Sequence, residues 1–219
     1  MKFEELPNNL RLRLNHAYWS IYLYNNSLHE LFLISDIVYT SSELKIANSR
    51  TFDFYRITLH YCFVMEYNKL LETGRKNKDQ NVSSLKQLND SVLEYLGGEF
   101  ITFHTKNKAT LDSIRNSEFY SKIRDLRDKR YGHSDNHEFN KPFTFRGFKT
   151  EDFEFGIQHL RLIKEIMDLC TKPFDFEFDI DIPNRENRTQ NFIKYQAKYQ
   201  DYYFKNFMEA EFGIKKSCT

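Results

Sequence analysis

Apolar side chains near the start of the chain recur every three or four residues over many turns. They are Leu10, Leu14, Ala17, Ile21, Tyr24, Leu28 and Leu31. This spacing places them on one face of an α-helix, because a helix turns about 100° per residue. An apolar stripe of this length has to be buried against other elements, so it predicts a long helix in the core that begins near Pro7.

The rest of the chain also favours helices. Only 7 glycines and 4 prolines occur among 219 residues, which leaves few turn signals for a fold of many short strands. Helical spacing predicts further helices over residues 43–72, 85–96, up to 126 from a start near Thr110 or Ser117, 150–172, and after Pro183. Residues 99–110 fit no element clearly. The predicted fold is all-α: an up-and-down bundle of about five helices over residues 1–172, with a C-terminal appendage over residues 173–219.

Several polar residues and glycines predict where these helices begin and end. Ser84 and Gln87 have the spacing of a capping box, and Thr150 is a candidate N-cap. The pair Gly97–Gly98 is a candidate helix end, because glycine accepts the left-handed backbone found there.

One segment departs from helical spacing. Residues 174–182 read FDFEFDIDI, a strict alternation of apolar and acidic side chains that is typical of a strand or an extended segment. No second strand is evident, so we expect it to lie across the helices or to meet a partner chain. Beyond it, aromatic side chains fall on one face of the last predicted helix: Phe192, Tyr195, Tyr199, Tyr203 and Phe207.

Charge, cysteines and hydropathy limit the functional classes. A formal net charge of +1 argues against a protein that coats nucleic acid and favours a local site, if nucleic acid is bound. The three cysteines lie far apart without metal-ligand spacing, which is typical of reduced thiols in a cytoplasmic protein. The chain contains no apolar run of membrane-spanning length, and the start MKFEELPNN lacks the apolar core of a signal peptide. We therefore expect a cytoplasmic protein with no membrane partner.

The stretch Ile123–Asp135, IRDLRDKRYGHSD, carries the densest chemistry. Arg127 is followed directly by Asp128, and His133 comes after five intervening residues. In a continuous helix Arg127 and His133 would point about 120° apart, but Gly132 allows the helix to end and the histidine to turn back. A guanidinium that binds phosphate and an imidazole that titrates near neutral pH would then share one site.

These residues resemble a known family. An arginine, a polar residue and a histidine four to six positions after the arginine form the signature of the HEPN superfamily of helical domains. LRDKRYGHSD is similar to the R-D-K-x-x-(A/G)-H-x-D motif of its abortive-infection, AbiU-like branch. The segment NVSSLKQL, at residues 81–88, resembles that branch's N-(L/V)-S-(L/I)-x-x-L motif and also lies upstream. The resemblance covers roughly residues 8–170.

The resemblance implies a metal-independent endoribonuclease that acts as a homodimer in phage defence or a toxin–antitoxin setting. The catalytic residues would be Arg127, Asp128 and His133, with no cofactor and no metal. RNA would be the substrate, contacted by a second set of side chains. These candidate substrate-binding residues are Arg124, Lys129, Arg130 and Tyr131. An antitoxin or a nucleotidyltransferase is a possible further partner.

Three other interpretations of the same residues are open. The arginine and aspartate can pair on the surface of a capped helix end while the histidine binds a carbonyl. His133, Asp135 and His137 alternate and are a candidate transition-metal site, although no further ligand completes the set. A module of the same fold that binds RNA, a nucleotide or a protein without turnover is the alternative function.

Overall fold

The computed structural model describes residues 3–35, 39–73, 83–128, 148–175, 178 and 188–212, and the regular structure in these ranges is helical. The α-helices are α1 (Asn8–Ser35), α2 (Ser41–Ala47), α3 (Arg50–Leu71), α4 (Leu85–Leu96), α5 (Ile101–Arg115), α6 (Glu118–Leu126), α7 (Thr150–Thr171) and α8 (Arg188–Phe212). Short 3₁₀ helices lie at Phe3–Glu5, Gly97–Phe100 and Lys172–Phe174. The prediction of an all-α helical bundle is confirmed.

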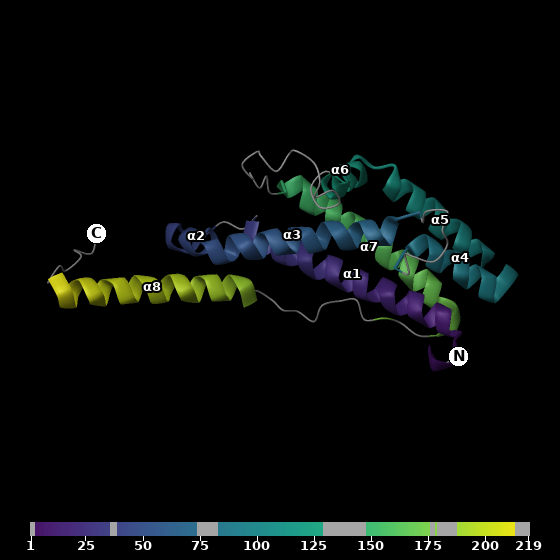
Figure 1. Ribbon diagram of the computed structural model, residues 1–219, viewed down its shortest axis with the longest axis horizontal. Helices are drawn as coiled ribbons and strands as arrows, with labels where there is room; N and C mark the ends of the chain where they lie inside the picture. Colours follow the sequence, from purple (N-terminus) through teal and green to yellow (C-terminus); the bar gives the residue numbers. More distant parts are fainter. Residues whose placement is uncertain are drawn as a thin grey trace.

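Helix α1 lies in the middle of the bundle and packs against α3, α4 and α7 (Figure 1). All seven residues of its predicted apolar stripe are buried. The core around it is rich in aromatic side chains, since the ring of Tyr24 lies 5.1 Å from that of Phe63 and 5.4 Å from that of Tyr67. The buried Tyr24 hydroxyl donates a hydrogen bond to the carbonyl oxygen of Gly156 in α7, 2.7 Å away. Wide side chains thus fill the space between the helices, as the shortage of small residues requires.

Glycine ends α4 as predicted. Gly97 has φ 63° and ψ −138°, and its backbone N–H donates to the carbonyl of Leu93. Side-chain caps act at other helix starts: Thr40 and Glu43 form a capping box on α2, and the hydroxyl of Ser117 accepts from the N–H of Tyr120 at the start of α6. Ser117, rather than Thr110, is therefore where the helix that leads to Arg127 begins.

Gly97→Ala is expected to destabilise the protein by roughly 1–2 kcal/mol, because an L-residue is strained at this positive φ. Gly98→Ala is the matched control. Neither position has a heavy atom within 4 Å of an added Cβ, but only Gly97 has the positive φ. Urea unfolding of the two variants measures the difference, and equal stabilities would contradict the assignment of strain to Gly97.

Three predicted local features are corrected, and one undecided stretch is assigned. The predicted helix over 43–72 is two helices, because Asn48 and Ser49 break it and Ser49 becomes the N-cap of α3. Ser84 makes no side-chain cap; its hydroxyl donates instead to the carbonyl of Glu72. Thr150 is the first residue of α7, whose N-cap is Lys149. Residues 99–110, which fitted no element clearly, belong to the 3₁₀ helix Gly97–Phe100 and to α5.

The segment over 174–182, predicted as a strand or as an extended segment across the helices or against a partner chain, forms no strand where the structure describes it. Phe174 is buried and ends a 3₁₀ helix that contains Pro173, and Asp175 follows with a left-handed φ of 57°. Phe178 stacks on Tyr18 of α1 with ring centroids 4.9 Å apart. Burial of single aromatic side chains, rather than strand pairing, holds these described positions. The other residues of the predicted strand lie outside the described ranges.

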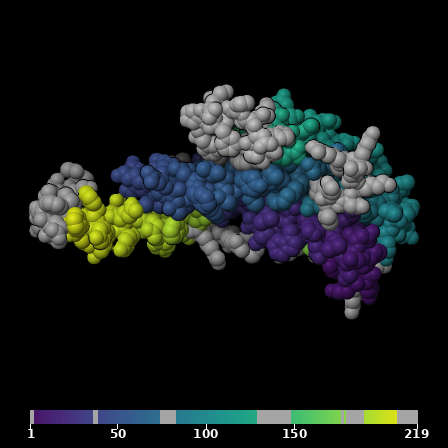
Figure 2. All heavy atoms as spheres, in the orientation of Figure 1, coloured from purple at the N-terminus to yellow at the C-terminus, as the bar shows by residue number. Residues whose placement is uncertain are grey.

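Helix α8 packs along α2 and on α1, and its far end extends beyond α2 (Figure 1). In the space-filling view α8 forms part of the narrow end of the molecule (Figure 2). A second, smaller apolar cluster joins it to the bundle: Ile34, Tyr39, Ile46, Ala47, Phe52, Ile193 and Ala197. Two hydrogen bonds also join α8 to the bundle. The Ser42 hydroxyl donates to Asp201 (3.3 Å), and the Thr189 hydroxyl donates to Glu30.

Among the residues that the structure describes, no helix combines the length and the apolar character needed to cross a membrane.

Candidate functional site

The structure describes part of the predicted site. Arg124 lies in α6, and Arg127 and Asp128 follow its last residue in a wider, π-helical turn. The other predicted site residues lie outside the described ranges, as do the expected turn at Gly132 and the alternative metal ligands. They are Lys129, Arg130, Tyr131, His133, Asp135 and His137.

Helix α6 is short, and its apolar face fixes where its C-terminal end lies. Phe119 and Ile123 are buried in the main core. The Phe119 ring contacts the rings of Tyr67 in α3 and His159 in α7, with centroid distances of 5.8 and 5.3 Å. Because α6 is held between α3 and α7 in this way, the residues after Leu126 emerge at the C-terminal end of α3.

The guanidinium of Arg127 contacts two carboxylates. Its Nε and Nη2 both lie 2.8 Å from Oδ1 of Asp128, and its Nη1 lies 2.7 Å from Oε1 of Glu72. Partial burial acts to lower the pKa of Arg127, but hydrogen bonds and charge from Asp128 and Glu72 outweigh it and raise the pKa above its ordinary value. Arg127 therefore stays charged. Its side chain is 24% exposed, and its contacts with the two carboxylates fix the orientation of the guanidinium.

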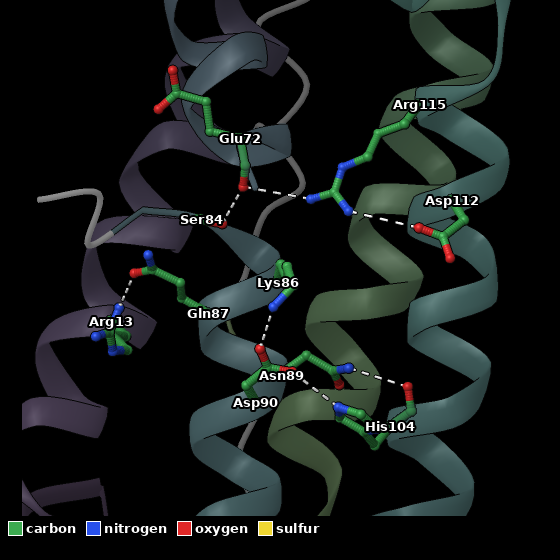
Figure 3. A network of polar contacts seen from close by, with 10 residues as sticks. All are labelled: Arg13, Glu72, Ser84, Lys86, Gln87, Asn89, Asp90, His104, Asp112 and Arg115. Carbon is green, nitrogen blue, oxygen red and sulfur yellow. Dashed lines mark hydrogen bonds and ion pairs between the residues drawn. The ribbon is translucent and has the colours of Figure 1, made fainter. Parts of the chain in front are cut away.

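Glu72 is the contact that the sequence did not reveal. It follows the last residue of α3, 55 positions before Arg127, and no local pattern links the two residues. Its backbone carbonyl accepts hydrogen bonds from the hydroxyl of Ser84 (2.6 Å) and from Nη2 of Arg115 (3.4 Å), while its carboxylate turns away from Arg115 (Figure 3). Arg115 also donates through Nε to the carbonyl of Leu71. The end of α3 is thus tied to α4 and α5, and it presents the Glu72 carboxylate to Arg127.

Two cationic side chains near Arg127 differ in whether they are available to bind a ligand. Arg124 is exposed, and its Nε lies 3.8 Å from Oδ2 of Asp128. It therefore lies at the edge of the cluster that Arg127 forms with Asp128 and Glu72. Lys122 pairs with Asp152, which also accepts a hydrogen bond from the backbone N–H of Lys149 at the start of α7. Arg124 is therefore placed to meet a ligand of Arg127, whereas Lys122 joins α6 to α7.

Three other histidines contact neighbouring side chains within the helical bundle. His159 is buried, and its Nδ1 lies 2.6 Å from the Tyr67 hydroxyl. Burial lowers the pKa of His159 to about 4 and raises the pKa of Tyr67, so both groups are uncharged at neutral pH. His60 is buried against Phe148, with ring centroids 4.7 Å apart, and His104 pairs with Asp90.

Within the described ranges, no three metal-ligating side chains of the His, Cys, Asp or Glu types gather as a candidate metal centre. The alternating set His133, Asp135 and His137 belongs to the part outside those ranges.

No protein-family model, no curated protein and no solved structure matched this chain.

Proposed function

We propose that this chain is a HEPN-type, metal-independent endoribonuclease that acts as a homodimer. The observation that carries the proposal is the fixed, charged guanidinium of Arg127. It is held by Asp128 and Glu72, and His133 follows six positions later in the chain. Arginine held in one direction by carboxylates is suited to bidentate recognition of a phosphate.

The proposed reaction is transesterification of RNA. The ribose 2′-OH attacks the adjacent phosphorus, its proton passes to a general base, and the P–O5′ bond breaks as the leaving oxygen takes a proton. The products are a 2′,3′-cyclic phosphate and a 5′-OH. Arg127 would stabilise the negative charge that develops on the phosphoryl oxygens, and His133 would transfer one of the protons.

The two carboxylates have a definite role in this proposal. Their contacts use three of the five guanidinium N–H groups, and no contact with a described residue uses the other two. Those two N–H groups would bind the phosphate, while Glu72 and Asp128 hold the guanidinium plane. Arg124 at the edge of the cluster would offset the carboxylates' charge, and Lys129, Arg130 and Tyr131 would contact the flanking nucleotides.

The biological setting proposed is phage defence or a toxin–antitoxin pair in the cytoplasm, with an antitoxin or a nucleotidyltransferase as a possible partner. The alternative function is a catalytically inactive helical module that binds RNA, a nucleotide or a protein. The two differ in one measurable property, turnover of RNA.

The deciding experiment is incubation of the purified protein with end-labelled RNA in EDTA. Cleavage that continues under chelation and leaves 2′,3′-cyclic phosphate ends supports the proposal. Activity lost in EDTA and restored by zinc or manganese would favour the metal site at His133, Asp135 and His137. A folded protein that binds RNA without cleaving it would favour the inactive module.

Asp128→Asn is expected to lower cleavage by about tenfold, because an amide orients the guanidinium less firmly than a carboxylate. Asp125→Asn is the matched control: it removes an equal charge three residues earlier, in α6, and the described contacts of Arg127 are with Asp128 and Glu72. Initial rates of RNA cleavage compare the two variants. Equal effects would remove the positioning role from Asp128.

A further inference from the structure

The exposed face of α8 carries a row of large aromatic side chains, which we call the aromatic stripe. It consists of Phe192, Tyr195, Tyr199, Tyr202, Tyr203 and Phe207, each between 44% and 70% exposed. At about 100° per residue, five of these side chains lie about 100° or more from the midpoint of Ile193 and Ala197, which bury one side of α8, and Phe207 lies about 60° from it. Stacked rings order the stripe, since Tyr199 and Tyr203 lie 6.4 Å apart and Tyr203 and Phe207 lie 6.3 Å apart.

An open apolar hollow continues the stripe at the start of α8. Thr189 and Phe192 of α8 line it together with Thr51, Phe52 and Tyr55 of α3, and its volume is about 380 Å³. A cavity of roughly 150 Å³ is enough to hold a benzene ring, so this hollow has room for an aromatic side chain. Phe192 belongs to both the hollow and the stripe, which makes them one continuous surface.

We propose that the aromatic stripe is a self-association surface, on which α8 of a second copy of this chain packs antiparallel to α8. A two-fold axis midway between Phe192 and Phe207, near Tyr199, brings the partner's Phe207 to the hollow beside Phe192. The same operation brings Phe207 of the first copy to the partner's hollow. One helix therefore supplies both the projecting rings and the hollow that receives them, as an isologous interface requires.

The exposed area of the aromatic stripe is consistent with a second copy of the chain as its binding partner. An aromatic residue has about 150–250 Å² of surface to bury, so six that are about half exposed present roughly 700 Å². A standard protein interface buries about 800 Å² per partner, and the apolar patches of monomers are mostly smaller than about 600 Å². Antiparallel pairing of the two stripes covers an area of the size that a stable dimer needs.

The charges on α8 favour a protein over a lipid surface. Helices that lie on membranes carry basic side chains on the polar face beside the apolar face. By helical spacing Lys194 and Lys198 lie on the side of α8 between the buried face and the stripe, and their charges act on Glu43 of α2. The pKa of Glu43 is lowered first by the hydrogen bond from the backbone of Thr40, and these two lysines lower it further. The tyrosines and phenylalanines of the stripe are typical of the centre of a protein interface, and the residues that fall among them by helical spacing, Gln196 and Asn206, are uncharged.

This surface is separate from the proposed catalytic site. The hollow lies at the start of α3, whereas Glu72 and Arg127 lie at its end, about 30 Å along the helix. The inference does not depend on ribonuclease activity. If the catalytic sites also pair across a second two-fold interface, the two contacts together produce a tetramer or a larger assembly.

Sedimentation velocity of the full chain at micromolar concentration tests the proposal, with Tyr199→Glu/Tyr203→Glu as the disrupting variant. Both side chains are more than half exposed, so the fold should survive, as circular dichroism would verify. Trp19→Glu on α1, where Trp19 is 57% exposed, is the matched control. We expect a wild-type dimer, an unchanged control, and a dissociation constant raised at least 100-fold in the double variant. A tetramer reduced to a dimer by the double variant also supports the stripe.

Three results would overturn the proposal. They are a wild-type monomer, a double variant that associates as well as wild type, and a monomer that binds anionic phospholipid vesicles through the stripe. Antiparallel order has its own test: oxidation of a mixture of Phe192→Cys and Phe207→Cys proteins should give a disulfide-linked heterodimer faster than either protein forms homodimers. Faster homodimers would contradict the proposed axis. RNA cleavage is measured separately, so failure of the stripe and failure of the catalytic proposal are distinguishable.

Discussion

His133→Ala and Arg127→Ala are each expected to lower RNA cleavage at least about 100-fold. The histidine variant loses a proton-transfer group, and the arginine variant loses the cation that faces the developing charge. Initial rates with end-labelled RNA in EDTA measure both effects. Arg127→Ala should leave the fold intact, because it releases Glu72 and Asp128 whose side chains are 45% and 43% exposed and can be solvated.

Matched controls separate a catalytic effect from a general one. His16→Ala in α1 and Arg161→Ala in α7 remove exposed side chains of the same types, so both should cleave RNA at the wild-type rate. Circular dichroism spectra of all four variants should coincide. If the controls lose activity to the same degree, or if His133→Ala retains full activity, the assignment of Arg127 and His133 is wrong.

Mixing the two inactive variants tests whether a dimer shares its sites. If each catalytic centre can use a histidine from one subunit and an arginine from the other, heterodimers recover part of the activity. Subunit exchange has to be verified on the same mixture by native mass spectrometry. A mixture that exchanges subunits and remains inactive means that every motif must be intact, and the shared-site arrangement then fails.

Lowering the pH from above 6.5 to about 4 is expected to destabilise the fold through His159. Its pKa is depressed in the folded state, so the unfolded chain binds a proton more tightly. The stability is fully present above pH 6.5, is lost as the pH falls toward 4, and changes no further below that value. With an allowance for solvent screening, the loss is about 2 kcal/mol. Protonation of Nδ1 would also remove the acceptor for the Tyr67 hydroxyl.

Urea unfolding across this pH range measures the effect. His159→Gln should be less stable at neutral pH but should lose about 2 kcal/mol less than wild type on acidification. His16→Gln, with an exposed histidine, should follow the wild-type curve. Carboxylates that titrate in the same range contribute equally to all three proteins, so the difference isolates His159. Parallel curves for wild type and His159→Gln would contradict the prediction.

The helical character of this protein could be predicted from local patterns in the sequence. The stripe from Leu10 to Leu31 is buried as its spacing requires, and Gly97 adopts the positive φ that glycine permits. These features depend on residues a few positions apart, which contact one another in any fold that contains the helix. The Arg127–Asp128 contact is of the same kind, because the residues are adjacent.

Contacts between distant residues were decided by the tertiary structure. Ser84 has the spacing of a cap, but its hydroxyl donates to the Glu72 carbonyl because packing brings the start of α4 to the end of α3. The helix predicted over 43–72 breaks at Asn48 and Ser49, and Ile46 and Phe52 on either side join the apolar cluster with α8. Glu72 reaches Arg127 only because burial of Phe119 and Ile123 fixes α6 beside α3. The periodicity of a helix predicts which of its side chains share a face. Which other helix packs against that face depends on how the whole core packs.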